Sequence, residues 1–265
     1  MAFSNGYTMG FAAAICVVCS LGVASTSIGL KPLQDANKLR EFQTQILTAV
    51  GLGDEAGAAE DVGALYAERI REVYINGEGE EQSDEFGKPK YEGVDRNGDD
   101  LVTYADVKLA RKEVKASGNS ELSLFPVFVR RDEGNTEGAY AIEMQGKGLW
   151  GPISGYLALK PDGQTILGAT FAAPKETPGL GYEIVNAPFC DQWKGKKVLG
   201  ADGTSKPVAV VKGKAAQLCP DAPEHCVDGI SGATITSQGV TAMVETALDE
   251  SYKNYLRTIQ SRFGG

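Results

Sequence analysis

The N-terminal stretch most strongly limits the structures that this chain can adopt, because the first thirty residues contain no charged side chain. Residues 9–30 (MGFAAAICVVCSLGVASTSIGL) are apolar or small throughout, and a helix of this length is about long enough to span a bilayer core. The sequence therefore predicts one transmembrane helix that anchors the chain in membrane lipid. A cleaved secretory signal is the alternative, since Gly22, Ala24 and Ser25 resemble a cleavage site, but the usual preceding basic residues are missing.

The charges that flank this span give a weak indication of its orientation. Lys31, Lys38 and Arg40 follow the span, and no basic residue precedes it. Under the positive-inside rule this asymmetry favours a cytoplasmic location for the rest of the chain.

Helical patterns continue beyond the span. Leu39, Phe42, Ile46 and Val50 form an apolar stripe at three- and four-residue steps, and Gly51 is expected to end that helix. A second helix is expected over residues 58–75. Its apolar face would consist of Val62, Leu65, Tyr66, Ile70 and Val73.

Residues 76–100 are rich in Glu, Asp and Gly and have almost no aliphatic side chains, which predicts a solvated loop. Residues 95–106 partly match a calcium-binding loop, with oxygen-bearing side chains at several ligand positions. However, Asp100 occupies the position that requires glycine, and Asp106 stands where the last ligand is normally Glu. A charged loop without metal is the default interpretation.

Short segments of alternating or β-forming residues begin near residue 121, separated by turn signals such as Glu133-Gly-Asn and Pro161-Asp-Gly. The predicted strands cover residues 122–130, 138–144, 149–159, 164–172 and 207–211. A long helix is predicted near the C-terminus. Because helices do not alternate with strands, this order indicates an α+β domain with an antiparallel sheet. We divide the chain into a transmembrane anchor (1–30), a helical membrane-proximal region with the acidic loop (31–120) and a third domain (121–265).

A turn rich in small and hydroxyl residues, Val227-Asp-Gly-Ile-Ser-Gly-Ala-Thr-Ile-Thr-Ser237, leads directly into the C-terminal helical pattern. Glycine and alanine let backbone approach a phosphate closely, and the first amides of a helix have no partner within the helix. This turn therefore predicts an anion site with Thr234 at its centre. An ordinary helix cap, in which Thr236 or Ser237 accepts from backbone amides, is the alternative.

Charge and composition exclude some classes of site. With a formal net charge of −9, the chain lacks the excess of basic residues that nucleic-acid binding needs. The single histidine, His225, excludes a histidine-rich metal site, and we expect it to be solvated. Cys219 and Cys226 are able to form a disulfide if their compartment is oxidising, which leaves Cys190 free.

Two adjoining segments resemble a known family. Asp228-Gly-Ile-Ser-Gly-Ala-Thr234 looks like the flavinylation motif of proteins that carry FMN on a threonine through a phosphoester. The flanking Thr236-Ser-Gln-Gly-Val240 resembles one family in particular, the C subunit of the Na+-translocating NADH:quinone oxidoreductase. Further matches are LKPLQ (30–34), QILTAVGL (45–52), GKGLWGPISGY (146–156) and ETPGLGYE (176–183). The chain between residues of about 53 and 137 is unmatched.

The resemblance implies a covalent FMN, transferred from FAD to the Thr234 hydroxyl by a flavin transferase. In this interpretation residues 121–265 form an FMN-binding domain. Asp228 would assist the transfer through a metal ion or by activating the hydroxyl. The remaining expected cofactor-binding residues are Ser231, Gly232, Ala233, Glu176, Thr177, Gly179, Leu180, Trp150 and Lys212. No residue of this chain is expected to be catalytic and none to bind a resident metal.

The resemblance also implies a role as an electron carrier among the other subunits of a respiratory Na+ pump, with NADH oxidation and quinone reduction on those subunits. The family places this domain on the periplasmic side of the cell inner membrane, against the charge asymmetry of the anchor. The G subunit of the ferredoxin:NAD+ oxidoreductase complex is an alternative within the same chemistry. A membrane-tethered binding module without redox activity is the alternative from a different class.

Overall fold

The computed structural model describes residues 5–81 and 125–263, and the chain divides into two units, with the boundary between Phe42 and Gln43. Helix α1 spans Asn5–Ala49 and contains Pro32. Its side chains up to residue 41 are exposed, and its most apolar 18-residue window has a mean hydropathy of 2.0. By length and composition α1 is therefore able to cross a membrane, and the expected stop near Gly51 is confirmed by the left-handed φ of 85° at that residue.

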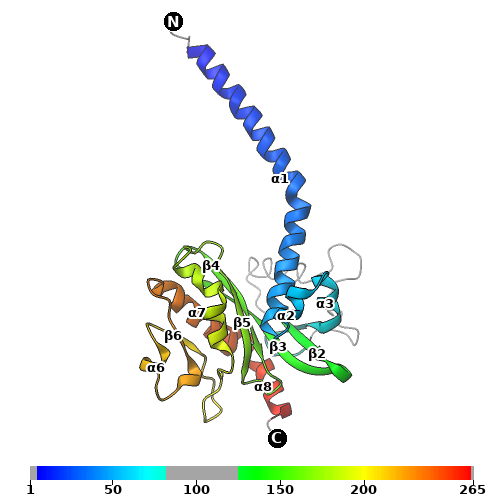
Figure 1. Cartoon of the computed structure of the whole chain (residues 1–265), viewed down its shortest axis with the longest axis vertical. Helices are drawn as coiled ribbons and strands as arrows, with labels where there is room; N and C mark the ends of the chain where they lie inside the picture. The colour runs from blue at the N-terminus through cyan, green and yellow to red at the C-terminus, as the bar shows by residue number, and fades with distance from the viewer. Residues whose placement is uncertain (1–4, 82–124, 264–265) are drawn as a thin grey trace. The chain divides into compact units, whose positions relative to one another are not determined.

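The second unit is built on a five-stranded sheet in which each strand pairs antiparallel with the next along the chain (Figure 1). The strands are β1 (Ile70–Ile75), β2 (Phe125–Asp132), β3 (Thr136–Lys147), β4 (Pro152–Leu159) and β5 (Ile166–Ala172). The predicted α+β class with an antiparallel sheet is confirmed. The turns expected at Glu133-Gly-Asn and Pro161-Asp-Gly connect neighbouring strands.

Three sequence-based boundaries were wrong in part. The expected helix over 58–75 is α3 (Val62–Arg69) followed by β1, because Ile70, Val73 and Ile75 pair with β2 and are buried. Residues 149–151 form a turn before β4. The segment 207–211 contains a strand, β6 (Ala209–Val211), but it pairs in parallel with β7 (Cys226–Asp228) in a separate two-stranded sheet.

The core lies on one face of the large sheet. Helix α7 (Thr234–Thr246), a π-helical turn (Ala247–Ser251) and helix α8 (Lys253–Phe263) cover this face with apolar side chains. The opposite face receives the last turn of α1, where Thr170 Oγ1 donates to the Gln45 carbonyl at 3.3 Å. Short α2 (Gly53–Ala58) lies between α1 and α3 in the chain. The predicted C-terminal helix is thus confirmed as two helices joined by the π-helical turn.

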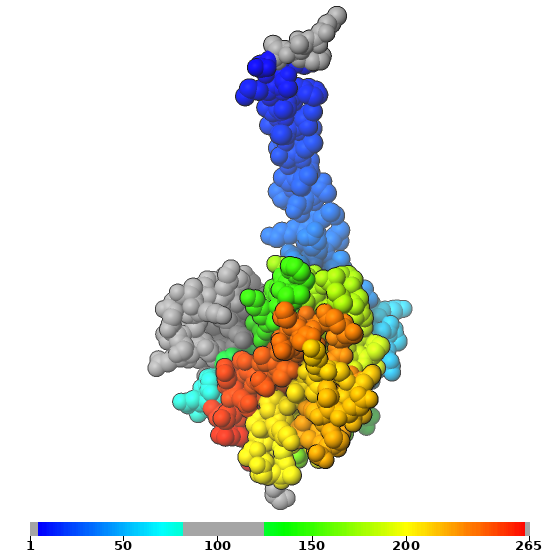
Figure 2. Space-filling view, turned by 90° about the vertical axis from the view of Figure 1, so that its left-hand side faces the viewer, coloured from blue at the N-terminus to red at the C-terminus, as the bar shows by residue number. Residues whose placement is uncertain are grey.

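The segment between β5 and α7 is held to the core by an aromatic cluster. Phe171 of β5 packs against Phe189 of helix α5 (Ala187–Cys190) and against Trp193, with ring centroids 5.5 and 5.4 Å apart. Val210 N of β6 donates to Thr241 Oγ1 of α7 at 2.9 Å. Figure 2 shows the β6–β7 region, in yellow and orange, directly beside the C-terminal helices. The smaller sheet is thereby fixed beside α7.

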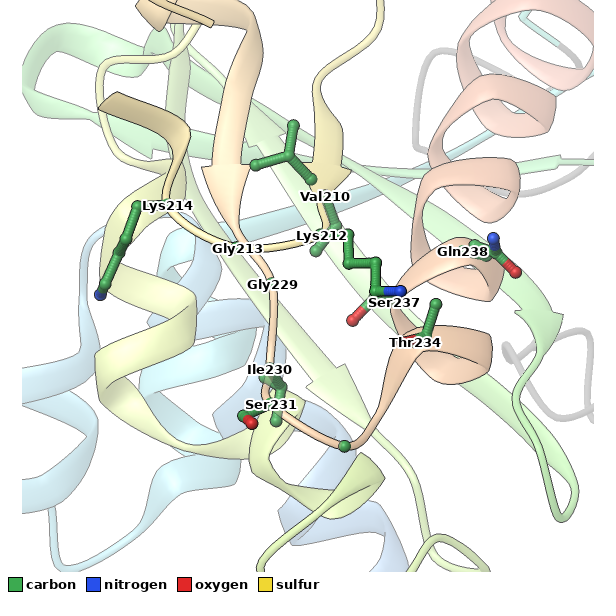
Figure 3. Close-up of a pocket in the computed structure, with 12 residues that line it drawn as sticks. Val210, Lys212, Gly213, Lys214, Gly229, Ile230, Ser231, Thr234, Ser237 and Gln238 are labelled. Atoms are coloured by element: carbon green, nitrogen blue, oxygen red, sulfur yellow. The ribbon is translucent and has the colours of Figure 1, made fainter. Parts of the chain in front are cut away.

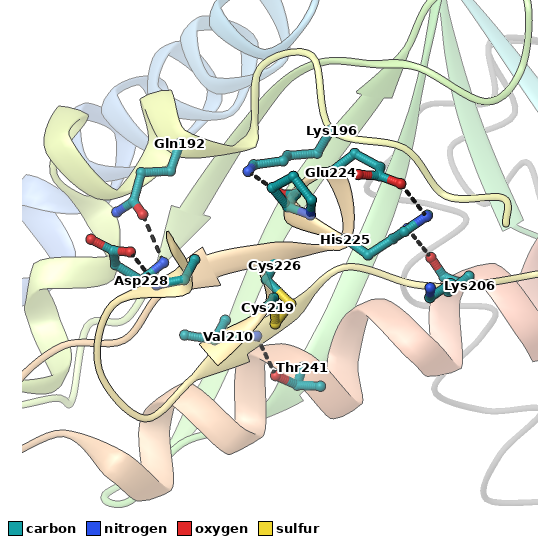
Figure 4. Close-up of a disulfide and its surroundings, with 12 residues drawn as sticks. Gln192, Lys196, Lys206, Val210, Cys219, Glu224, His225, Cys226, Asp228 and Thr241 are labelled. Atoms are coloured by element: carbon teal, nitrogen blue, oxygen red, sulfur yellow. Dashed lines mark hydrogen bonds and ion pairs between the residues drawn. A yellow bond between two sulfur atoms is a disulfide. The ribbon is translucent and has the colours of Figure 1, made fainter. Parts of the chain in front are cut away.

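His225 is buried rather than solvated, which corrects the expectation from sequence. His225 directly precedes β7, and its Nδ1 is 2.9 Å from the Lys197 carbonyl. The same nitrogen is 3.0 Å from the Lys206 carbonyl (Figure 4). Carbonyl oxygens only accept, so Nδ1 carries the proton. Through these contacts the imidazole ring links the start of β7 to the segments around Lys197 and Lys206, which are remote in sequence.

The cysteine pairing left open by the sequence is present. Cys219 and Cys226 form a disulfide that joins the segment after helix α6 (Ala215–Leu218) to β7 (Figure 4). Cys190 is free and half-buried. Burial, with a smaller contribution from the charge of Asp191, raises the pKa of the Cys190 thiol to about 11.

We expect Cys190 to resist alkylation in the folded protein. A rise in pKa from the ordinary 9.0 to about 11 lowers the thiolate fraction at pH 8 about a hundredfold. The measurement is the rate of iodoacetamide labelling in a variant with Cys16 and Cys19 replaced by serine, with urea-unfolded protein as the control. Equal labelling rates of folded and unfolded protein would show that the Cys190 thiol is accessible and that its pKa is not raised.

Candidate functional site

A cavity of about 580 Å³ lies between the ends of β6 and β7 and the first turn of α7 (Figure 3). Its lining consists of Val210, Val211, Lys212, Gly213, Lys214, Gly229, Ile230, Ser231, Gly232, Thr234, Ser237 and Gln238. Four residues expected from the sequence, Thr234, Ser231, Gly232 and Lys212, are thus brought together. Lys214, Ser237 and Gln238 were not among the expected site residues, although each lies within four residues of an expected one.

Thr234 is the first residue of α7 and is partly exposed to the cavity. The residue that precedes the helix is Ala233, which is buried and provides no side-chain cap. Gly232 has a left-handed φ of 77°, and a Cβ there would lie 2.8 Å from Leu180 Cδ2. Glycine is therefore required at this position, and the tight turn presents the Thr234 hydroxyl at the cavity.

The interpretation of this turn as an ordinary cap is wrong. Neither Thr236 nor Ser237 caps α7, and the side chain of Thr236 instead donates to Glu176 Oε2 at 2.6 Å. Within the described part of the chain, the backbone N–H groups of Thr234 and Ile235 have no acceptor. Such free amides, together with the helix dipole, favour an anion at this end of α7.

The charge of the lining also favours an anion. Among the described residues that line the cavity, two are lysines and none is acidic, although the whole chain has a net charge of −9. Lys212 is exposed and extends from the end of β6 toward the first turn of α7 (Figure 3). The cavity therefore provides positive charge, free amides and hydroxyl groups in one place, which is the donor set that a phosphate requires.

Asp228 lies at the end of β7, outside the cavity lining. Its carboxylate accepts from Lys214 Nζ at 2.8 Å and from Ala215 N at 2.7 Å, and its own N–H donates to Gln192 Oε1 at 2.8 Å. The hydrogen bond from Lys214 and that from the Ala215 amide lower the pKa of Asp228. The carboxylate therefore stays ionised and joins β7 to the turn after β6.

Glu176 is a buried carboxylate with both oxygens bound to protein donors. Oε1 accepts from Trp150 N at 2.8 Å, and Oε2 accepts from the Thr236 hydroxyl at 2.6 Å. Only 5% of the residue is exposed. Gly148 and Gly181 pack against this carboxylate so closely that a Cβ at either position would lie within 2.6 Å of it. Glu176 thus holds three chain segments together around the start of α7.

The other expected residues do not line the cavity. The Thr177 carbonyl accepts from Leu180 N at 3.1 Å, and Gly179, with φ of 76°, donates its N–H to Glu183 Oε1 at 3.0 Å. These bonds shape the turn that brings Leu180 against Gly232. The Trp150 side chain is 66% exposed, and its backbone is what contacts Glu176. Large apolar side chains exposed on these segments are Leu149, Trp150, Leu180, Tyr182 and Ile235.

No group of three or more potential metal ligands is found within residues 5–81 and 125–263. The partial calcium motif at 95–106 and most of the acidic loop lie outside the described residues.

A family model for an FMN-binding domain matches residues 148–249, a range that contains β4, β5, the whole lining of the cavity and α7. The C subunit of the Na(+)-translocating NADH-quinone reductase from Neisseria meningitidis serogroup B is 34% identical, over 94% of this chain and 92% of the relative. The chain belongs to the family of C subunits of this reductase.

Two solved structures agree with this assignment. The crystal structure of the same subunit from Parabacteroides distasonis is 33% identical and superimposes with a TM-score of 0.63, covering 86% of this chain and 96% of that one. NqrC from Shewanella oneidensis is 25% identical, with a TM-score of 0.64, and the match covers 85% and 99% of the two chains. The family resemblance seen in the sequence is confirmed, and the C subunit of the quinone reductase is favoured over the G subunit of the ferredoxin-dependent complex.

Proposed function

We propose that this chain carries FMN on Thr234 through a phosphoester and acts as an electron carrier in a Na+-translocating NADH:quinone reductase. The observation that supports the proposal most is the placement of Thr234. Its hydroxyl lies at the basic cavity, at the amide end of α7, within a segment that matches the flavinylation motif. The family model and the relatives support FMN and the complex, and the attachment to Thr234 is our proposal.

In the proposed maturation step a flavin transferase brings FAD to Thr234. The threonine oxygen forms a bond to the phosphorus of the FMN half, the pyrophosphate bond of FAD breaks, AMP leaves, and the hydroxyl proton passes to a base. Asp228 was expected to assist this step. Because the Asp228 carboxylate already accepts hydrogen bonds from Lys214 and Ala215, we propose that Asp228 mainly fixes the turn that carries Lys212.

Different residues would bind different parts of the cofactor. Lys212 and the free amides of α7 would hold the phosphate, while Ser231, Gly232 and Ala233 form the turn that presents Thr234. Leu180 and Trp150 would provide apolar surface for the ring system, with Thr177 and Gly179 shaping the loop that carries Leu180. Bound FMN supplies one-electron transfer, and the protein binds, orients and tunes it.

Mass spectrometry of the intact protein tests the cofactor assignment. Co-expression with a flavin transferase should increase the mass by one FMN less one water, and expression without the transferase should not. A protein that stays colourless and unmodified in the presence of an active transferase would instead support a tethered module without redox activity.

We further propose that residues 31–265 lie on the periplasmic side of the inner membrane, held by α1 and associated with the other subunits. The disulfide between Cys219 and Cys226 supports this, because such bonds persist in oxidising compartments. A reporter active only outside the cytoplasm, fused after Gly265, should be active. Activity from a reporter that works only in the cytoplasm would contradict this topology and support the charge asymmetry around α1.

A further inference from the structure

The hydroxyl groups near Thr234 have different surroundings. Ser231 is exposed on the turn, and Thr236 is bound to Glu176. Ser237 is only 5% exposed and lines the cavity, yet its Oγ has no hydrogen-bond partner among the described residues. A buried hydroxyl without a partner destabilises a protein, so its presence at a cavity indicates a ligand that would satisfy it.

The position of Ser237 identifies the part of the ligand that it would bind. Ser237 follows Thr234 by three residues, so both side chains lie on the same face of α7, one turn apart. Figure 3 shows the Lys212 side chain extending toward the turn where both residues lie. A group attached to Thr234 by phosphate therefore places its phosphoryl oxygens, rather than its ring system, nearest to Ser237.

We propose that Ser237 is a phosphate-binding residue whose hydroxyl donates a hydrogen bond to a phosphoryl oxygen of the FMN carried by this chain. The inference rests on the proposed function for the identity of the ligand. It assigns to Ser237 no part in forming the covalent bond. Thr236, which is nearer to Thr234 in sequence, has a structural role through Glu176 and does not bind the phosphate.

The first test compares the melting temperature of full-length protein, in detergent, with and without covalent FMN. Ser237→Ala removes the unpaired buried hydroxyl, so the melting temperature of the flavin-free form should stay constant or rise. In the loaded form the same change removes a bond to the phosphate, and the melting temperature should fall by about 2–4 °C. Ser261→Ala, the same chemical change at an exposed position of α8 outside the cavity lining, is the matched control and should shift both forms equally.

The second test needs no covalent bond, so it reports on Ser237 even if FMN attaches elsewhere or not at all. Flavin-free protein is titrated with FMN and with riboflavin, which lacks the phosphate, and quenching of flavin fluorescence gives each Kd. Ser237→Ala should weaken FMN binding about tenfold and leave riboflavin binding unchanged. Equal effects on both flavins, no effect on FMN, or equal shifts in melting temperature of the two forms would overturn the assignment.

Discussion

Replacing Thr234 with alanine should abolish covalent flavin completely while the protein still folds and inserts in the membrane. The change removes the oxygen that we propose forms the phosphoester. Thr234 does not cap α7 and makes no side-chain hydrogen bond within the described residues, so the free energy of unfolding should change by no more than about 0.5 kcal/mol. Flavin fluorescence of the band on a denaturing gel measures the loss.

Ser231→Ala is the matched control for this variant. It removes a hydroxyl from the same turn and the same cavity, and its band should remain as bright as that of the unchanged protein. Thr236→Ala is a less suitable control, because it also removes the hydrogen bond to Glu176. A bright Thr234→Ala band would exclude Thr234 as the attachment site.

Replacing Glu176 with alanine should lower the free energy of unfolding by about 3 kcal/mol, the largest stability effect that we expect from a change at this site. The change leaves both the Trp150 N–H and the Thr236 hydroxyl without their acceptor in a buried environment. Glu176→Gln keeps one carbonyl oxygen and the side-chain shape, so its loss should be about 1 kcal/mol. Urea unfolding of the full-length protein in mild detergent, followed by tryptophan fluorescence, measures both.

Glu183 provides the control for this experiment. Its carboxylate also accepts two hydrogen bonds, from Gly179 N at 3.0 Å and Asn186 Nδ2 at 2.7 Å, but it is partly exposed. Water is able to replace the lost acceptor, so Glu183→Ala should reduce stability by less than about 1 kcal/mol. Equal losses at positions 176 and 183 would mean that the buried carboxylate does not hold the three segments together.

Local signals in the sequence predicted most elements of the fold. The glycine at position 51 correctly predicted the end of the first helix. Two turn motifs correctly predicted the β2–β3 and β4–β5 connections. The strand β1 was missed because Val62, Tyr66, Ile70 and Val73 also fit a helical period, and only pairing with β2 decides between the two. The burial of His225 was missed because it depends on two carbonyl groups about 20 and 30 residues away.

The candidate site was predictable where one short segment determines it. The motif around Thr234 folds locally into the turn and the first residues of α7. Glu176 was expected near the flavin, but its pairing with Trp150 and Thr236 depends on contacts between segments far apart in sequence. The role that we propose for Ser237 was not predicted, because the lack of a hydrogen-bond partner for its Oγ is evident only in the folded structure.

Fragmentation mass spectrometry of the loaded protein tests the central claim most directly. The full-length protein is purified after co-expression with a flavin transferase, digested, and the fluorescent peptide is sequenced by fragmentation. We expect one modified peptide that contains residues 228–238, with the FMN mass on Thr234 and unmodified Ser231, Thr236 and Ser237. FMN mass on any other residue, or released FMN with no modified peptide, would contradict the account.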